Sequence, residues 1–185
     1  YNHFKSLKVN GVNFLLPDAN HDHLPPTSVT DSDTPYADWY IKLFDQWFYE
    51  KPEDTLNITY FSMFVDYILG SDATWDNMGK EENSVMVIET NGGIESVDVL
   101  KICGDGFTKT AANVLTHSFD EATHTTLAKF YRFSGSMLSK KCLACPINET
   151  CGSGYIPHRY SSANGFNNPS VYCNDLMKLI THIQN

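Results

Sequence analysis

Four of the five cysteines in this 185-residue chain are gathered near its C-terminal end. They follow the spacing C-x2-C-x5-C-x21-C and are Cys142, Cys145, Cys151 and Cys173. Two nearby thiolates can bind one ion or cluster from a single turn, and the Gly-Ser-Gly after Cys151 lets the backbone turn towards the same centre. The spacing therefore predicts a four-thiolate site, which constrains the fold because the last cysteine has to return to the first three.

The spacing leaves three chemistries open for these thiols. They are a structural zinc site, an iron–sulfur cluster with four cysteine ligands, and a pair of disulfides. Zinc ribbons usually have two C-x2-C pairs, whereas this chain has one. From spacing alone, a zinc site and an iron–sulfur cluster are therefore about equally favoured. The count of five is odd and the cysteines are clustered, which argues against a secreted disulfide framework. We therefore expect a reducing compartment, the cytoplasm.

Composition and charge exclude several partners. Hydrophobic residues make up 42% of the chain and aromatic residues 13%, enough for a globular core. The formal net charge is −9, whereas nonspecific binding to nucleic acid or to anionic membranes needs a basic surface. No apolar run approaches the roughly 20 residues of a membrane span. We expect neither nucleic acid nor a membrane as a partner.

The first half of the chain has the order of helix, turn and strand that is typical of an α/β unit. A helix end leads through the turn signal Asn10-Gly11 to a short buried strand at 12–16. Thr34, as a capping hydroxyl, and the proline after it start a helix that ends by residue 51. A second helix covers about 56–69, and a polar linker follows at 71–83. This pattern predicts a first domain at 1–75.

The second half predicts an α+β domain at 80–185. A β-hairpin pairs 85–89 with 94–99 around Asn-Gly-Gly. A helix is expected at about 119–133, the cysteine region is loop-like, and a last helix covers 175–183. The predicted fold class is therefore α/β becoming α+β, with a hairpin, a cysteine-rich loop and a C-terminal helix in the second part.

The cysteine pattern, the Gly-Ser-Gly turn and the distant last cysteine together resemble the SPASM domain, the C-terminal extension of radical SAM enzymes that modify peptides and proteins. The segment 89–95 looks like the hairpin that opens this domain. Segments 142–146, 151–160 and 165–176 are similar to a subgroup of peptide maturases often labelled regulators of arylsulfatase. Residues 14–21 look like a late strand of the family's partial (β/α) barrel. The resemblance covers nearly the whole chain and is strongest from residue 85 onward.

The resemblance implies one auxiliary [4Fe–4S] cluster. The ligands of the family's outer cluster match the four clustered cysteines, Cys142, Cys145, Cys151 and Cys173. The inner cluster is not supported, because its ligand positions fall here on Asp98 and Tyr155. Cys103 is near the ligand position at Asp98 in the sequence but does not coincide with it, so we expect it to be a free thiol or an occasional substitute ligand.

The resemblance also implies radical chemistry that this chain cannot perform by itself. The C-x3-C-x2-C motif that binds the S-adenosylmethionine-cleaving cluster is absent from the 185 residues. Because the chain begins at Tyr1, we expect it to be the C-terminal part of a longer oxidoreductase that matures a ribosomally made peptide or protein. S-adenosylmethionine and its cluster would then bind only in the preceding part. The alternative is a non-catalytic, zinc-stabilised module that binds a protein.

Five further residues, and a possible metal site at two histidines, are weaker site candidates. Three roles are open for Asp98: a cluster ligand, a proton acceptor near the substrate, or a charge on the hairpin with no further role. Two are open for Asn20 and His21: lining a substrate cavity, or belonging to an ordinary polar loop. His158 and Arg159 hydrogen-bond cluster sulfurs or substrate carbonyls, or form a salt bridge that stabilises the loop. A histidine site for metal is also open, from His21 and His23 with Asp18 or Asp22.

Overall fold

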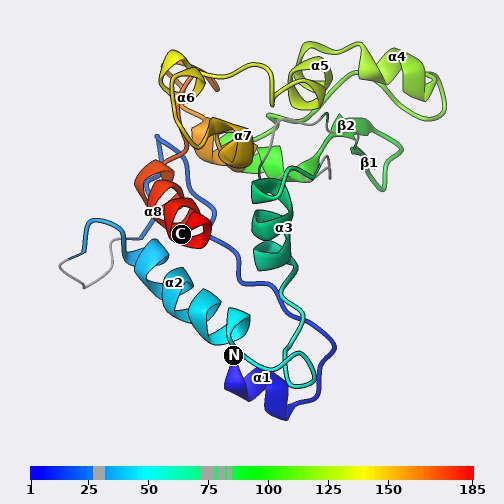
Figure 1. Cartoon of the computed structure of the whole chain (residues 1–185). Coiled ribbons are helices and arrows are strands. Elements are labelled where there is room, and N and C mark those ends of the chain that lie inside the picture. The colour runs from blue at the N-terminus through cyan, green and yellow to red at the C-terminus, as the bar shows by residue number, and fades with distance from the viewer. Residues whose placement is uncertain (27–31, 72–77, 79–81, 83–84) are drawn as a thin grey trace. The chain divides into compact units, whose positions relative to one another are not determined.

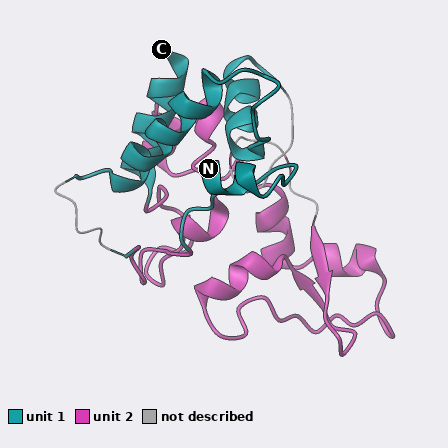
Figure 2. Ribbon diagram, turned by 90° about the horizontal axis from the view of Figure 1, so that it is seen from below, with its two compact units in different colours: residues 1–17, 26–73, 172–185 teal, residues 18–25, 74–171 magenta. Residues whose placement is uncertain are grey.

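The computed structural model describes residues 1–26, 32–71, 78, 82 and 85–185 (Figure 1). The chain forms two compact units, which Figure 2 shows in different colours. Unit 1 comprises Tyr1–Pro17, Pro26–Ala73 and Tyr172–Asn185, and unit 2 comprises Asp18–Pro25 and Thr74–Val171. The last helix thus belongs to unit 1, whereas the prediction from sequence grouped it with the cysteine-rich region. The predicted linker at 71–83 lies almost wholly outside the described residues.

Unit 1 is helical and contains α1 (Asn2–Ser6), α2 (Pro35–Phe48), α3 (Thr59–Ile68) and α8 (Cys173–Gln184). The C-terminal helix α8 packs against both α2 and α3. Their apolar faces form an aromatic core, in which an edge-to-face ring contact joins α2 to α3. Its buried members include Tyr40, Phe44, Phe61, Phe64, Leu179 and Ile180. The helices predicted from apolar spacing in this unit are confirmed.

The N-terminus of α2 is capped by another helix. Asp175, in the first turn of α8, accepts a hydrogen bond from the Ala37 N–H at 2.9 Å. Thr34 was predicted as the capping hydroxyl, but its side chain makes no capping bond and instead accepts from Lys178 Nζ at 3.1 Å. The Asp175 carboxylate supplies the acceptor in its place, so the cap depends on tertiary packing.

The strand predicted at 12–16 is wrong. Gly11 forms one isolated parallel bridge with Asn57, and the Val12 N–H donates to Asn57 O at 2.9 Å, but no strand follows. Leu15 is 72% exposed. A strand needs a neighbour along its length, and no further ladder partner for this segment exists among the described residues. An apolar run is therefore not sufficient to form a strand here.

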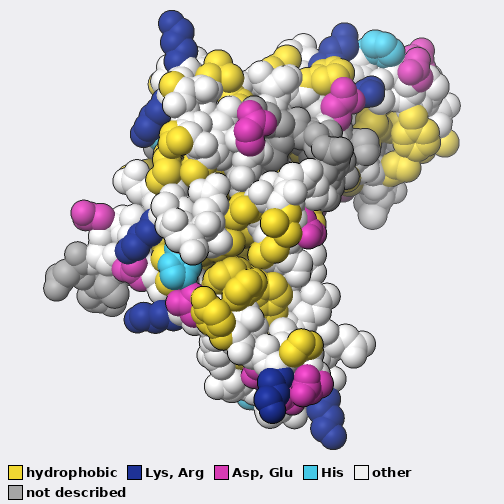
Figure 3. All heavy atoms as spheres, in the orientation of Figure 1, with side chains coloured by type: hydrophobic (Ala, Val, Ile, Leu, Met, Phe, Trp, Pro, Cys, Tyr) yellow, Lys and Arg dark blue, Asp and Glu magenta, His cyan; other side chains and the backbone are white. Residues whose placement is uncertain are grey.

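Large hydrophobic side chains of unit 1 also remain at the surface. Trp39 on α2 is 49% exposed, and Leu69, just after α3, is 78% exposed. In Figure 3 hydrophobic side chains gather at the surface over α2 and α3. Exposed apolar areas of this kind are typical of surfaces that contact other protein. None of the helices in the described ranges combines the length and apolar character that crossing a membrane requires.

Unit 2 opens with the predicted β-hairpin. Strands β1 (Met86–Ile88) and β2 (Ile94–Ser96) pair antiparallel, with Val87 opposite Glu95. Gly92 in the turn has φ +83°, and a Cβ there would lie 2.9 Å from the Asn113 side-chain oxygen. The turn therefore requires glycine. The hairpin is the sheet of this α+β chain within the described residues.

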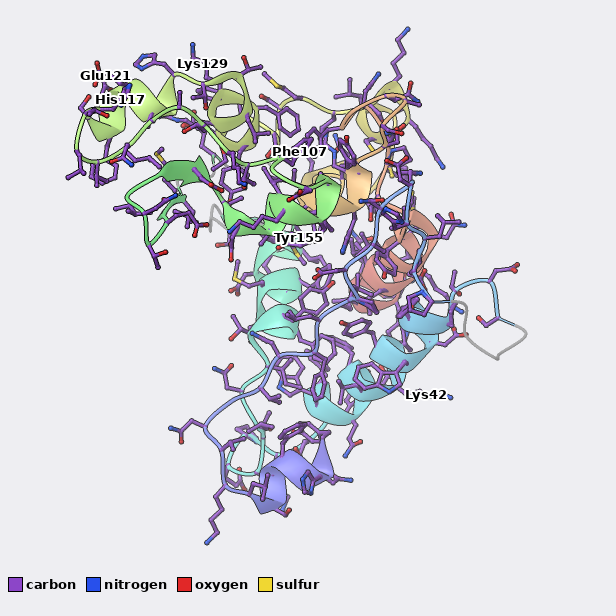
Figure 4. All side chains as sticks on the ribbon, turned by 180° about the vertical axis from the view of Figure 1, so that it is seen from behind. Lys42, Phe107, His117, Glu121, Lys129 and Tyr155 are labelled. Atoms are coloured by element: carbon purple, nitrogen blue, oxygen red, sulfur yellow. The ribbon has the colours of Figure 1, made fainter. Side chains whose placement is uncertain are left out.

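The hairpin is followed by the 3-10 helix η1 (Asp98–Cys103) and by two short helices, α4 (Phe119–Thr123) and α5 (Thr126–Arg132). Both short helices contact β2. The sequence predicted one helix at 119–133. The structure divides it because Thr125 caps α5, its hydroxyl accepting from the Ala128 N–H at 3.2 Å. In Figure 4 Glu121 and His117 lie at the α4 end of this unit, and Lys129 lies on α5.

The cysteine region contains short helices where the sequence predicted a loop. They are α6 (Lys140–Leu143), α7 (Asn148–Cys151) and the 3-10 helix η2 (Ile156–Arg159). The helix η2 packs on η1, and both contribute residues to an apolar core. The buried members of this core are Val97, Leu100, Cys103, Tyr131 and Ile156.

Candidate cysteine-ligand site

Three of the four clustered cysteines lie on or beside α6 and α7 in unit 2. Ser139 caps α6, and its hydroxyl accepts from the Cys142 N–H at 3.3 Å. Cys145 follows α6 closely, and its N–H donates to Cys142 O at 3.0 Å. Cys151 is the last residue of α7. The Cys142 side chain is buried, and those of Cys145 and Cys151 are half-buried.

The backbone after Cys151 is strongly curved. Gly152, Ser153 and Gly154 have φ values of +54°, +73° and +67°, three left-handed residues in succession. Serine rarely adopts this conformation. The curve lets the Ser153 hydroxyl lie 3.2 Å from Cys142 Sγ. The sequence predicted a glycine turn, but it did not identify Ser153, and a serine between two glycines after a cysteine is the signal that was available.

Asn148 lies between the second and third cysteines and was not a predicted site residue. Its side chain is 8% exposed. Its Oδ1 atom is buried and has no hydrogen-bond partner among the described residues. Buried polar atoms are nearly always partnered, so this amide oxygen is an exception among the described residues. Thiols are the donor type of zinc and iron–sulfur centres, but the described residues assemble no group of three or more such side chains for one metal ion.

His158 and Arg159, predicted to act behind the cysteines, are both buried in η2. The His158 ring packs edge-to-face on Tyr155, with ring centroids 5.1 Å apart. The Arg159 guanidinium donates to backbone carbonyls of its own unit, including Ser134 O at 3.1 Å. Within the described residues no carboxylate forms an ion pair with Arg159, so the predicted alternative of a salt bridge finds no partner there.

The two residues at the ligand positions of the family's inner cluster, Asp98 and Tyr155, begin and precede helices that pack on an apolar core. Asp98 begins η1 and is exposed, and Tyr155 precedes η2, the helix that packs on η1 (Figure 4). Cys103 lies in the core itself. Burial, with a smaller effect from the Asp22 charge, raises the pKa of the Cys103 thiol to about 12. A thiol with this pKa is neutral at physiological pH in the metal-free chain.

The loop of Asn20 and His21 is held by its own hydrogen bonds. Asn20 is 1% exposed, and its Oδ1 accepts from the backbone N–H groups of Asp22 and His23 at 2.9 and 2.8 Å. Its Nδ2 donates to Ile102 O at 3.1 Å. His21 is exposed, and its Nε2 lies 2.8 Å from Pro169 O. In the parts of the chain that the structure describes, no group of three or more His, Cys, Asp or Glu side chains is assembled for one metal ion.

Unit 2 also has a polar cavity of about 320 Å³ beside the hairpin. Its lining includes Glu95, a buried carboxylate that accepts from Thr108 Oγ1 at 2.5 Å. Lys101, at its edge, forms an ion pair with Glu89 at 2.5 Å. None of the sequence-predicted site residues lines this cavity, so it is separate from the cysteine site.

Cys173, the fourth predicted ligand, is the first residue of α8 in unit 1 and is half-buried. Tyr172, the residue before it, anchors this end of the helix, since its hydroxyl donates to Pro17 O at 2.8 Å. Asp175, two residues later, holds the N-terminus of α2. The cysteine is therefore carried by a well-anchored first turn.

Comparison with known proteins identifies the fold. No protein-family model matches the chain, and no curated protein matches it. Solved structures of anSMEcpe, a radical SAM/SPASM anaerobic sulfatase-maturating enzyme, do match. The polyhistidine-tagged enzyme with bound AdoMet matches with a TM-score of 0.79, 18% identity, and coverage of 98% of this chain and 47% of that chain.

Native anSMEcpe with bound AdoMet and Cp18Cys peptide matches with a TM-score of 0.76, 17% identity, and coverage of 98% of this chain and 50% of that chain. The same enzyme with AdoMet and Kp18Cys peptide gives a TM-score of 0.75 and 19% identity, with the same coverage. The chain thus spans about half the length of the structures it matches. It has the fold of the C-terminal part of a radical SAM/SPASM enzyme.

Proposed function

We propose that this chain is the C-terminal part of a radical SAM enzyme that modifies a ribosomally made peptide or protein, and that it carries one auxiliary [4Fe–4S] cluster. The observation that carries the proposal is the fold match over 98% of the chain. The cysteine spacing supports it, because the same segment that matches the fold holds the C-x2-C-x5-C-x21-C pattern.

The proposed cluster ligands are Cys142, Cys145, Cys151 and Cys173. Such a cluster would supply one-electron transfer or a covalent brace for the domain. The protein contributes the capped α6 helix, which fixes Cys142, and the left-handed turn, which curves the chain after Cys151. Asn148 lies between Cys145 and Cys151 in the sequence and has a buried side-chain oxygen. Polar groups placed just behind metal ligands orient those ligands and tune the centre, and Asn148 is our candidate for that role.

Peptide binding by the matched enzyme supports a peptide or protein as the substrate of the parent protein, since anSMEcpe is crystallised with peptides. Of the four residues predicted on the substrate side, His21 is exposed, whereas Asn20, His158 and Arg159 are buried. We propose His21 as the residue that contacts the substrate and the other three as residues that support it. A cytoplasmic location follows from the need to keep the thiols reduced.

Cysteine variants test the ligand set. Wild-type chain and single variants are purified without oxygen, and iron, acid-labile sulfide and zinc are measured in each. Cys142→Ala, Cys145→Ala, Cys151→Ala and Cys173→Ala should each lose most of the iron and sulfide. Cys103→Ala is the matched control and should keep both, because its thiol lies in the apolar core. Loss of the cluster in Cys103→Ala would show that the ligand set is wrong.

The radical chemistry is tested on the parent protein. This chain by itself is expected not to cleave S-adenosylmethionine, because its 185 residues lack C-x3-C-x2-C. If the gene encodes residues before Tyr1, we expect that motif among them and S-adenosylmethionine cleavage by the longer protein. A longer protein without the motif, or one zinc and no sulfide in this chain, would instead support the zinc-stabilised binding module.

A further inference from the structure

The polar cavity beside the β-hairpin of unit 2 has no place in the proposed function. Its volume of about 320 Å³ lies within the range of small-ligand pockets. Its described lining consists of polar residues and glycines and includes no cysteine. Two lining residues are buried, Glu95 at 8% and Thr108 at 1% exposure, and the others are more accessible to solvent. Glu95 and Thr108 therefore form the inner wall of the cavity.

Both residues of this inner wall are held in place by the fold. Glu95 lies in β2, between the strand pairing with β1 and a backbone bond on the other side, where the Ile94 N–H donates to Ala112 O at 2.9 Å. Phe107, the residue before Thr108, packs against the apolar core of unit 2 (Figure 4). The carboxylate and the hydroxyl are thus presented to the cavity from anchored backbone.

The Glu95 carboxylate has acceptor capacity to spare. Its Oε2 accepts from Thr108 Oγ1 at 2.5 Å, and its Oε1 has no hydrogen-bond partner among the described residues. The Thr108 oxygen donates its proton to Glu95 and keeps its own lone pairs for a further donor. A neutral glutamine could accept the same bond from Thr108, so that bond does not require a charge. A buried charge without a counter-charge is unfavourable, so this site favours a cation.

The charges around the cavity agree with this sign. Its lining holds three carboxylates and two ammonium groups, so the balance is negative. Lys101 already forms an ion pair with Glu89 at 2.5 Å, and no ion pair of Glu95 occurs within the described residues. Mainly the hydrogen bond with Glu89, and to a smaller extent the charge of Glu95, raise the pKa of Lys101. The field of the Glu95 carboxylate therefore reaches the edge of the cavity and stabilises a cation there.

We propose that this cavity binds a primary ammonium group, from the lysine side chain of a peptide or from a free alkylamine, through the Glu95 carboxylate and the Thr108 hydroxyl. An ammonium group is compact and has three donors, which suits two neighbouring acceptors. A guanidinium binds best to two free carboxylate oxygens, whereas one oxygen of Glu95 is already bonded to Thr108. The inference goes beyond the proposed function and does not depend on a cluster, because no cysteine lines the cavity.

The first test is calorimetric titration of the 185-residue chain with four probes. They are the blocked tripeptide Ala-Lys-Ala, the same tripeptide with its lysine amine acetylated, the tripeptide with arginine in place of lysine, and butylamine. We expect the lysine tripeptide to bind about tenfold more tightly than the acetylated one, because acetylation removes a charged hydrogen bond. Equal binding of these two tripeptides, tighter binding of the arginine tripeptide, or no binding of either amine would overturn the inference.

The same titration separates the two sources of the ammonium group. Butylamine binding as tightly as the lysine tripeptide would support the site and assign it to free amines. Tighter binding of the tripeptide would support the site and assign it to peptides, because backbone groups of the peptide would then contact the rim of the cavity.

Charge variants test the role of Glu95 with the lysine tripeptide as the probe. Glu95→Gln keeps an acceptor for Thr108 and should weaken binding by about tenfold. Lys101→Gln removes a competing cation and should tighten binding by about threefold. Asp120→Asn is the matched control, because it removes the same charge from an exposed position on α4 outside the cavity, and it should leave binding unchanged. Unchanged binding in Glu95→Gln, no tightening in Lys101→Gln, or an equal loss in Asp120→Asn would overturn the inference.

A second measurement needs no variant and so remains decisive where Glu95→Gln does not fold. The lysine tripeptide is titrated into the ¹⁵N-labelled wild-type chain, and backbone amide shifts are followed by nuclear magnetic resonance. We expect the shifts to concentrate in the lining segments 89–91 and 104–109 and at Glu95. Shifts confined to other segments would overturn the inference.

Discussion

Replacing Asp175 tests how unit 1 is held together. Its carboxylate caps α2 from α8 by accepting the Ala37 N–H at 2.9 Å, and it is 9% exposed. Losing a helix cap costs about 1 kcal/mol, and leaving a buried N–H without a partner adds to that cost. We expect Asp175→Ala to lower the free energy of unfolding by about 2 kcal/mol. Asp175→Asn keeps an acceptor and should cost less than about 1 kcal/mol.

The pH dependence of this difference has a definite sign. Burial raises the pKa of the Asp175 carboxyl, and backbone hydrogen bonds from Ala37 and Tyr36 act in the opposite direction. The folded state therefore holds the proton more tightly than the unfolded state. The stability of the wild type relative to Asp175→Asn should be greatest below the unfolded pKa of about 3.9 and should decrease as pH rises through the folded pKa.

The measurement is denaturant unfolding across this pH range, followed by the fluorescence of Trp39 and Trp47 in unit 1. Asp66→Asn is the matched control, because it removes the same charge from an exposed position on α3. A loss below about 0.5 kcal/mol in Asp175→Ala, typical of an ordinary surface substitution, would refute the capping argument. A relative stability that increases with pH would refute the assignment of the raised pKa.

Two further predictions concern unit 2. The pKa of the Cys103 thiol is raised to about 12, so at pH 8 it should react with iodoacetamide about a thousandfold more slowly than an ordinary thiol. After unfolding it should react at the normal rate. Mass spectrometry of the metal-free chain measures the labelling, and a Cys103 labelling rate equal to that of Cys145 would contradict the prediction. Gly92→Ala should lower the free energy of unfolding by about 2 kcal/mol, because a Cβ at φ +83° would lie 2.9 Å from the Asn113 side chain. Gly70→Ala, with φ +85° and no atom within 4 Å of its Cβ, is the control for backbone strain in the same unfolding assay, and an equal loss in both variants would show that the Asn113 contact does not matter.

Elements whose pattern is local could be predicted from the sequence. The apolar stripe of α2, the inward face of α8 and the Asn-Gly-Gly turn of the hairpin each specify their own structure. The run at 12–16 has the composition of a strand, but strand formation depends on a neighbour that the pattern cannot supply. The division of 119–133 into α4 and α5 depends on which of several hydroxyls caps a helix, and Thr125 does so only once the backbone has turned.

The candidate site shows the same division between local and tertiary information. The four thiols were proposed as ligands from their spacing, and His158 and Arg159 as their supports from their place after the glycine turn. The contact of Ser153 with Cys142 and the orphan amide of Asn148 depend on the curve of the backbone. The carbonyl partners of Arg159 lie up to 25 residues away in the sequence, so its contacts follow only from the folded structure.

The most direct test of the central claim is the metal content of the wild-type chain purified without oxygen. The fold and the cysteine set predict about four iron and four sulfide per chain, with zinc well below one. One zinc per chain with neither iron nor sulfide would contradict the auxiliary cluster and assign the cysteines to a structural zinc site.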